Sequence, residues 1–166
     1  MINLSDPAPC IPKLSVADIV SDDPNGDPKQ YETEFNFIQK YGRHFNPASL
    51  PPTIPAGPMK DCLANAAQLA LAVSELIYVE GIGRLFCGRN FLPFYHAWCC
   101  DQKGNVLDRT WTKPERIRIE YFGVPFKTQF LKHFVQNQRN PCQLITPKCI
   151  SYMESLHQRE WLHPLF

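Results

Sequence analysis

The stretch "FYHAWCCDQKGNVLDRTW", residues 94–111, has the pattern of a β-hairpin. Its first arm is rich in aromatic residues, "DQKGN" has the residue types of a turn, and "VLDRTW" over 106–111 returns as a second strand. If Asp101–Lys103 form a three-residue loop, His96 lies directly opposite Asp108, with Cβ atoms about 5 Å apart. A four-residue loop would place the pair on a diagonal. An antiparallel sheet therefore begins here, and it carries a histidine beside a carboxylate.

A helix is predicted before this hairpin, in "DCLANAAQLALAVSELIYVEG" at residues 61–81. Asp61 is a candidate N-cap because its carboxylate can accept hydrogen bonds from backbone N–H groups, and Cys62 would then be the first helical residue. The frequent alanines would let this helix pack closely against a neighbour. The chain is expected to leave the helix toward a strand or turn that breaks at Gly81 and Gly83. The apolar residues that recur at helical spacing are Leu63, Ala66, Ala67, Ala70, Val73 and Ile77.

The rest of the chain is expected to add helices and one more strand. The proline-rich "NPASLPPTIPAGP" precludes regular structure between the first of these helices and Cys62. The order of helix, strands and helix is typical of an α+β domain, here with a central helix packed on an antiparallel β-sheet. The expected elements are a loop over 21–30, a helix within 31–45, a strand over 119–126, a helix over 127–138 and a last helix within 149–162.

The composition is that of one ordinary globular domain. With 166 residues, of which 44% are hydrophobic and 20% charged, the chain is long enough to bury a core without disulfide or metal support. We therefore expect a single domain over 1–166, with an irregular proline-rich N-terminal region over 1–57 and a catalytic core over 58–166. The net charge of +1 arises from interspersed acidic and basic residues, which argues against the basic stripe of a nucleic-acid binder.

The seven cysteines follow no repeated spacing, which predicts mostly free thiols in a reducing compartment. Cys99 and Cys100 are adjacent and would point to opposite faces of a strand. The first residues, "MINLSDPAPC", lack the basic and apolar segments of a Sec-type signal peptide, and no apolar run approaches the length of a membrane span. We expect a cytoplasmic protein with no membrane partner, although export by a route without such a signature stays open.

Cys62, His96 and Asp108 together have the chemistry of an activated thiol. The first turn of a helix favours an anion and lowers the pKa of a cysteine there, although a nearby Asp61 carboxylate would oppose this effect. A histidine partner would make the thiolate dependable. An aspartate bonded to one imidazole nitrogen would fix the tautomer and leave the other nitrogen facing the thiol. Taken separately, each part also fits a structural role, as a small buried cysteine and a histidine–aspartate pair.

Three segments, in this order, resemble the transglutaminase-like branch of the papain-like cysteine enzymes. They are "DCLANAAQLAL" around the thiol, "HAW" with the histidine, and "GNVLDRTW", which is close to the family's usual Gly-x-Val-x-Asp-x-Thr-Trp; the match covers roughly residues 58–125. The resemblance implies a papain-like α+β fold, and we expect neither a cofactor nor a metal. It also implies a triad in which Cys62 is the nucleophile, His96 the general base and acid, and Asp108 the residue that orients the imidazole.

The chain departs from the family pattern around the oxyanion site. "TIPAGPMKDC" holds no glutamine before the cysteine, so the Cys62 backbone N–H supplies one donor and the second is open. Arg109 replaces the proline that usually follows the aspartate, and it is expected on the other strand face. Glu80 either lines the substrate cleft or is an exposed charge at a strand end. Trp98 either shields the site or packs in the core. The candidates for the second donor are Gln39, Asn46 and Asn65.

Other classes of protein compete with the enzyme interpretation. The cysteines and the histidine near the hairpin raise the question of a zinc site, but the tight Cys-x2–4-Cys spacing of such sites is missing from the sequence. The same fold without activity would be a protein-interaction module. Within the enzyme class, protease, glutamine deamidase, transglutaminase and acyltransferase share the first half-reaction and differ in the acceptor. We expect a thiol hydrolase of a protein or peptide, with the identity of the substrate and the oligomeric state left open.

Overall fold

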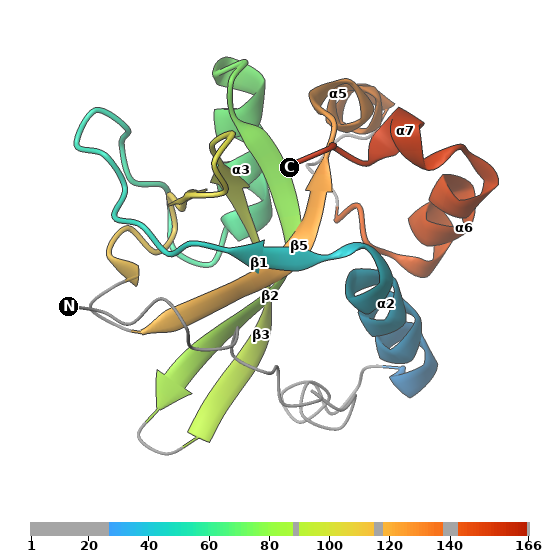
Figure 1. Ribbon diagram of the computed structural model, residues 1–166, viewed down its shortest axis with the longest axis horizontal. Helices are drawn as coiled ribbons and strands as arrows, with labels where there is room; N and C mark the ends of the chain where they lie inside the picture. The colour runs from blue at the N-terminus through green and yellow to red at the C-terminus, as the bar shows by residue number, and fades with distance from the viewer. Residues whose placement is uncertain (1–26, 88–89, 115–117, 138–142, 166) are drawn as a thin grey trace, which may run out of the picture.

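The computed structural model describes residues 27–87, 90–114, 118–137 and 143–165, and most of the loop expected over 21–30 lies outside them. These residues form a five-stranded antiparallel sheet in the order β1-β5-β2-β3-β4, with helices against one face (Figure 1). The prediction of an α+β domain is confirmed. The strands are β1 Arg43–Phe45, β2 Ile77–Cys87, β3 Asn90–Cys100, β4 Val106–Leu107 and β5 Ile119–Phe126. The helices are α2 Pro28–Tyr41, α3 Cys62–Ala72, α5 Thr128–Asn137, α6 Pro147–Ser155 and α7 Gln158–Trp161.

The two faces of the sheet bury different clusters. On the face that carries the helices, alanines of α3 pack on Ala97 and Cys99 of β3. The small side chains allow a close approach, since the Cys99 thiol donates to the Ala66 carbonyl at 3.1 Å. The opposite face buries a smaller cluster that contains Trp98 and Cys100. The prediction that Cys99 and Cys100 point to opposite faces is therefore confirmed.

The helix before the hairpin ends earlier than its apolar spacing predicts. Val73 is the C-cap of α3, and Ile77 is already the first residue of β2. Both side chains are β-branched and fit a strand better than a helix, and Ile77 pairs with Cys100 in the sheet. Pairing between distant residues thus decides the boundary. β2 and β3 pair along their whole length, and the end of β2 and the start of β3 lie away from the helices at the lower left of Figure 1.

The glycines of β2 do not break the strand, contrary to the expectation from the sequence. Gly81 pairs with His96 of β3 on one side and with Gly123 of β5 on the other. A Cβ at Gly81 would lie 2.3 Å from the Phe122 carbonyl oxygen, and a Cβ at Gly123 would lie 2.7 Å from the Trp98 ring. The glycines therefore let neighbouring strands approach and leave room for aromatic rings over this part of the sheet.

The N-terminal region over 1–57 is only partly irregular, because it contains α2 and β1. α2 begins earlier than the predicted range of 31–45, since Asp27 is its N-cap and accepts a 3.0 Å hydrogen bond from a first-turn N–H. Gly42 follows the helix in an extended conformation, and β1 then pairs with β5. The proline-rich segment before α3, which the structure describes in full, contains no helix or strand, as predicted.

The C-terminal half follows the predicted order. β5 matches the strand predicted over 119–126, and α5 begins one residue later than the helix predicted over 127–138, whose last residue lies outside the described ranges. The last predicted helix, within 149–162, is instead two helices, because Leu156 and His157 between them are extended. Within the described ranges, the chain has no helix that is both long enough and apolar enough to cross a bilayer.

Candidate functional site

His96 and Asp108 lie side by side, but not through the predicted register. Cys100 pairs with Val106, so the loop of the hairpin runs over residues 101–105 instead of comprising three or four residues. The return strand is β4 alone, and Asp108 follows it. His96 Nε2 nevertheless lies 2.7 Å from Asp108 Oδ2, which makes a buried charged pair.

Asp101 sets the longer turn. Its Oδ1 accepts hydrogen bonds from the Lys103 N–H at 2.8 Å and from the Asn105 N–H at 2.9 Å. Gly104 has a φ of 78°, in the left-handed region that favours glycine. The residue types of the turn were visible in the sequence. Its length depends on these side-chain hydrogen bonds, which a pattern of residue types does not specify.

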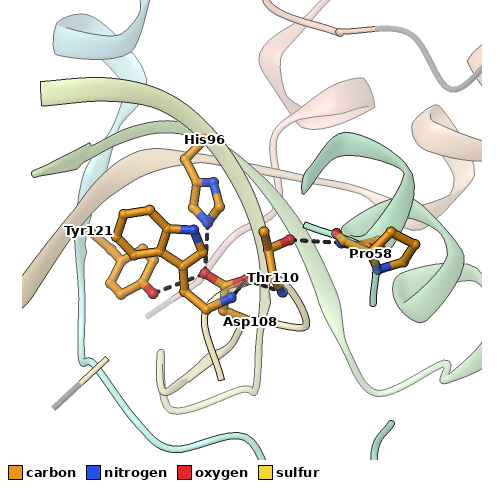
Figure 2. A network of polar contacts seen from close by, with 7 residues as sticks. Pro58, His96, Asp108, Thr110 and Tyr121 are labelled. Carbon is orange, nitrogen blue, oxygen red and sulfur yellow. Dashed lines mark hydrogen bonds and ion pairs between the residues drawn. The ribbon is translucent and has the colours of Figure 1, made fainter. Parts of the chain in front are cut away.

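Asp108 accepts four hydrogen bonds, and Figure 2 shows the polar network around it. Oδ2 faces His96 and also accepts the Tyr121 hydroxyl at 3.0 Å, while Oδ1 accepts the N–H groups of Thr110 at 2.8 Å and Trp111 at 3.0 Å. Burial acts to raise the pKa of Asp108, but the hydrogen bond and charge of His96 and the two backbone N–H groups bring it below its ordinary value. Asp108 is therefore an anion in the interior.

His96 is enclosed by aromatic rings. Its ring centroid lies 5.4 Å from Phe94, 5.8 Å from Trp111, 6.0 Å from Trp98 and 6.1 Å from Tyr121. Burial acts to lower the pKa of His96, but hydrogen bonds and charges of Asp108 and the Cys62 thiol raise the pKa from 6.5 to about 9. The imidazole is therefore a cation at neutral pH. Trp98, which is buried in the smaller core, both packs in the core and covers the histidine.

Cys62 is the first residue of α3, as predicted, and its side chain is half-buried. Burial acts to raise the pKa of the thiol, but the hydrogen bond and charge of His96 and the backbone N–H groups of Ala97 and Leu63 lower it below 9.0. Asp61 occupies the N-cap position without the predicted capping hydrogen bond. Its carboxylate therefore leaves the first-turn N–H groups of the helix available to an anion.

The edge of β3 explains how a thiol on a helix meets a histidine on a strand. β4 pairs only with Cys99 and Cys100, so within the described residues β2 is the single strand partner of β3 near His96. The Ala97 N–H interacts with Cys62 at this edge. Because His96 Nε2 faces Asp108, Nδ1 is the ring nitrogen left for the thiol. The three residues of the predicted triad are thus brought together.

Asn65 connects the helix of the thiol to the loop of the carboxylate through Pro58 and Thr110, both of which Figure 2 labels. Its Nδ2 donates to the Pro58 carbonyl and to Thr110 Oγ1, each at 2.8 Å. Both amide hydrogens are therefore used, which makes Asn65 a positioning residue and not a free oxyanion donor. Gly57 lies against the same side chain, since a Cβ there would be 2.0 Å from Asn65 Oδ1. A glycine at this position lets the loop before Cys62 close over Asn65.

The remaining polar candidates lie elsewhere. Gln39 is exposed on α2, a helix that packs against β5 and α6. Asn46 is exposed, and its backbone bonds to the hairpin at Gly104 and Val106. Arg109 follows β4 in a loop, where its Nε donates to the Pro55 carbonyl at 2.9 Å, so it is not on a strand face at all. Gln39 and Asn46 are thus exposed and both amide hydrogens of Asn65 are used, so the structure singles out none of the three as a second oxyanion donor.

Glu80 is not exposed, contrary to the expectation of a charge at a strand end. It lies within β2, is 0% exposed and shares the face of Tyr78, which carries the helices. Its carboxylate accepts the Tyr78 hydroxyl at 2.6 Å, the Tyr95 hydroxyl, and the N–H groups of Leu144 at 2.7 Å and Ile145 at 3.0 Å. Burial raises the pKa of Glu80, and these donors offset only part of that effect. It is a buried junction between the sheet and the segment before α6.

The sequence reasoning did not identify Tyr121 or Thr110 as part of the site. Thr110 was quoted in the motif after Asp108, where a hydroxyl two residues from a carboxylate is a local signal of a polar loop. Tyr121 carries no local signal beyond its place in an apolar strand. Its role depends on β5 lying two strands away from His96 in the sheet, which is visible only in the fold.

The other described cysteines are poor candidates for the nucleophile. Cys99, Cys100 and Cys149 are buried, while Cys62 alone among the four cysteines with described side chains is half-buried. Burial raises the pKa of Cys100 to about 12 and that of Cys99 well above its usual range. Across residues 27–87, 90–114, 118–137 and 143–165, no three His, Cys, Asp or Glu side chains converge as ligands of a metal would.

No protein-family model, curated protein or solved structure matches this chain. The site brings together a half-buried thiol at a helix start, a protonated imidazole that lowers the pKa of that thiol, and a buried carboxylate bonded to the imidazole.

Proposed function

We propose that the chain is a thiol hydrolase that acts on amide groups of a protein or peptide through Cys62, His96 and Asp108. We further propose that its α+β fold is of the papain-like, transglutaminase-like kind. The observation that carries the proposal is the pairing of a half-buried thiol, whose pKa is lowered, with a buried imidazolium that is held by Asp108, which three further donors fix in place. Such a pair supplies both a nucleophile and an acid at neutral pH.

In the first half-reaction, the Cys62 thiolate attacks the amide carbonyl carbon. A C–S bond forms and the carbonyl π electrons move to oxygen, where the uncapped N–H groups at the start of α3 face the negative charge. His96 then gives its Nδ1 proton to the amide nitrogen, the C–N bond breaks and the amine or ammonia leaves. The product is a thioester on Cys62, and His96 is now neutral.

In the second half-reaction, neutral His96 takes a proton from a water molecule, whose oxygen attacks the thioester. The C–S bond breaks and returns the thiolate to Cys62, while His96 is again protonated. Asp108 holds Nε2–H throughout and stabilises the imidazolium. With a side-chain amide as substrate the result is deamidation, and with a backbone amide it is peptide cleavage. An amine in place of water would give transamidation.

Alkylation of the individual cysteines by iodoacetamide at near-neutral pH tests the nucleophile. Peptide mapping is expected to find fast labelling at Cys62, its loss in Cys62→Ala, and slow labelling in His96→Ala. Cys99 and Cys100 serve as internal controls, because both are buried and should label only after unfolding. Fast labelling that concentrates on Cys99 or Cys87 instead of Cys62 would show that the assignment is wrong.

The same measurement separates the enzyme from a protein-interaction module on this fold. In a protein-interaction module the thiol would not be activated by His96. Cys62 would then be alkylated at the rate of an ordinary cysteine, and this rate would be the same in the wild type and in His96→Ala. Intact-mass analysis of candidate protein substrates then identifies the reaction. Deamidation exchanges an NH2 group of the substrate for OH and changes its mass accordingly. Cleavage gives two fragments, and transamidation adds the mass of the amine less that of ammonia.

A further inference from the structure

A cleft lies on the face of the sheet that carries the helices. It has a volume of about 260 Å³ and lies between α2 and the strands β2 and β3. Pockets for drug-sized ligands begin at roughly 300 Å³, so this cleft is sized for one side chain or a small molecule. Its walls combine a carboxylate with aromatic and aliphatic side chains. This combination is suited to a cation on an apolar stem.

Glu34 supplies the carboxylate of the cleft. It is 5% exposed, and its Oε1 accepts a 3.0 Å hydrogen bond from Gln30 Nε2. Burial raises the pKa of Glu34, the hydrogen bonds of Gln30 and Gln143 oppose this effect, and the charge of Glu80 adds to it. The donors around Glu34 are thus neutral amides, which solvate a carboxylate without neutralising it.

Glu80 adds a second buried carboxylate behind the wall of the cleft. Its Oε2 accepts the hydroxyl of Tyr95, whose side chain lines the cleft. The hydrogen bonds that Glu80 accepts from Tyr78, Tyr95, Leu144 and Ile145 come from two tyrosine hydroxyls and two backbone N–H groups, none of which carries a positive charge. The ion pairs between described residues include Lys40–Glu154, Arg84–Glu120 and His96–Asp108, and none of these three includes either carboxylate.

Two coupled carboxylates without a cation are costly to bury. Each would gain from a positive charge placed in the cleft, because attraction between charges is strong where water is excluded. The rings of Tyr31 and Tyr95 line the same space, and aromatic faces also attract cations. Ile38 and Ile82 offer apolar contact to an aliphatic stem. An ammonium group on a methylene chain satisfies all of these surfaces at once.

A row of side chains on one face of the sheet joins the cleft to the surroundings of the candidate thiol. Tyr95 directly precedes His96 in β3, and it is joined through Glu80 to Tyr78. Burial first, then the charge and hydrogen bond of Glu80, and then the charge of Cys62 raise the pKa of Tyr78. The row from Tyr78 through Glu80 to Tyr95 therefore extends from the neighbourhood of the thiol to the wall of the cleft, on one face of the sheet.

We propose that this cleft binds the ammonium group of a lysine-type side chain in the protein or peptide substrate. Glu34 is its direct carboxylate partner, and Glu80 adds negative charge behind Tyr95. The cleft would then select substrates with a basic residue near the amide that Cys62 attacks. This inference rests on the proposed function, because it assigns a specificity site to the same reaction.

The test is a titration of the full chain, with its isoleucine methyl groups labelled for NMR, by Nα-acetyl-lysine N-methylamide. Ile38 and Ile82 line the cleft and should shift, while Ile77 and Ile119, in the core of the opposite face, should not. The norleucine analogue has the same stem without the charge and is expected to bind about tenfold more weakly or worse. This comparison uses only the wild-type protein.

Two matched variants separate the charge from the fold. Glu34→Gln keeps the shape of the side chain and is expected to weaken binding of the lysine analogue about tenfold. Glu32→Gln changes an exposed residue of the same helix and should leave the affinity unchanged. Equal affinity for the lysine and norleucine analogues, or shifts that avoid Ile38 and Ile82, would overturn the proposal.

The outcome can be separated from that of the proposed function. Binding of the lysine analogue in the cleft does not require Cys62. If Cys62 of the wild-type protein is alkylated rapidly but the protein does not bind the lysine analogue, the protein is an enzyme without this specificity site. Conversely, a protein that binds the analogue in the cleft but has an unreactive Cys62 contradicts the proposed function and leaves only a cation-binding cleft.

Discussion

The Tyr121 hydroxyl donates a 3.0 Å hydrogen bond to Asp108 Oδ2, the same oxygen that lies 2.7 Å from His96 Nε2. Tyr121 belongs to β5, and β2 lies between β5 and the strand of His96. The tyrosine therefore reaches the carboxylate across β2, at a level where that strand has glycines. The orientation of Asp108 is thus fixed by the sheet as well as by its own loop.

Tyr121→Phe removes the hydroxyl that holds Asp108 but keeps the aromatic ring, so it should loosen the carboxylate without leaving a large cavity in the core. Asp108 would keep three of its hydrogen bonds, so we expect the free energy of unfolding to fall by about 1–3 kcal/mol. Alkylation of Cys62 at neutral pH should slow several-fold, because a less firmly held carboxylate supports the imidazolium less. Tyr152→Phe, at an exposed tyrosine, is the control. A folded Tyr121→Phe variant that alkylates like the wild type would contradict the positioning role.

The pH dependence of the site follows from its two shifted groups. The pKa of Cys62 lies below 9.0, so the rate of alkylation should rise with pH and reach its midpoint below that value. The pKa of His96 is raised to about 9, so turnover should decline as the pH passes about 9 and the imidazole loses the proton that the leaving amine needs. Because Cys62 and His96 interact, the pH values at which the rate rises and turnover declines are properties of the pair and not of each residue separately.

His96→Ala provides the check on this coupling. The variant removes the hydrogen bond and the charge that lower the pKa of Cys62, while the burial that raises the pKa remains. The alkylation midpoint should therefore move to higher pH. His163→Ala, away from the site on the C-terminal segment, is a suitable control. An alkylation profile in His96→Ala that coincides with the wild type would show that the two side chains do not interact.

Local chemistry explains what was predictable from the sequence. The start of α3 at Cys62 follows from a polar residue before an alanine-rich segment, and the turn after Cys100 follows from Asp, Gly and Asn within five residues. The alternation of side chains along a strand also separates Cys99 from Cys100. Each of these features depends on residues that are close in the chain, so a pattern can specify them.

Contacts between distant segments explain what was not predictable. The boundary at Ile77 is set by pairing with Cys100, and the role of Asn65 depends on Thr110 in another loop. Glu80 looked like an exposed charge because a single glutamate between apolar residues gives no sign of its donors. Two of those donors are backbone N–H groups more than sixty residues away, at Leu144 and Ile145.

Thr110→Val tests the link between the helix of the thiol and the loop of the carboxylate. Valine has a similar shape but no hydroxyl, so one hydrogen of the buried Asn65 amide would lose its acceptor. We expect the free energy of unfolding to fall by about 1–3 kcal/mol. In the double variant Thr110→Val/Asn65→Ala, the decrease in the free energy of unfolding should be smaller than the sum of the decreases in the two single variants. Thr33→Val, on the exposed side of α2, is the control, and strict additivity would contradict the link.

Glu80→Gln tests whether the buried carboxylate holds the segment before α6 to the sheet. A glutamine places an NH2 group where the carboxylate accepts the Leu144 and Ile145 N–H groups, so donors would face donors. We expect a loss of about 2–4 kcal/mol in chemical denaturation, together with faster amide exchange at those two residues. Glu154→Gln, at the exposed pair with Lys40, should leave both measurements near the wild type. Unchanged stability in Glu80→Gln would mean that the Glu80 carboxyl is neutral in the fold, and it would remove this charge from behind the cleft.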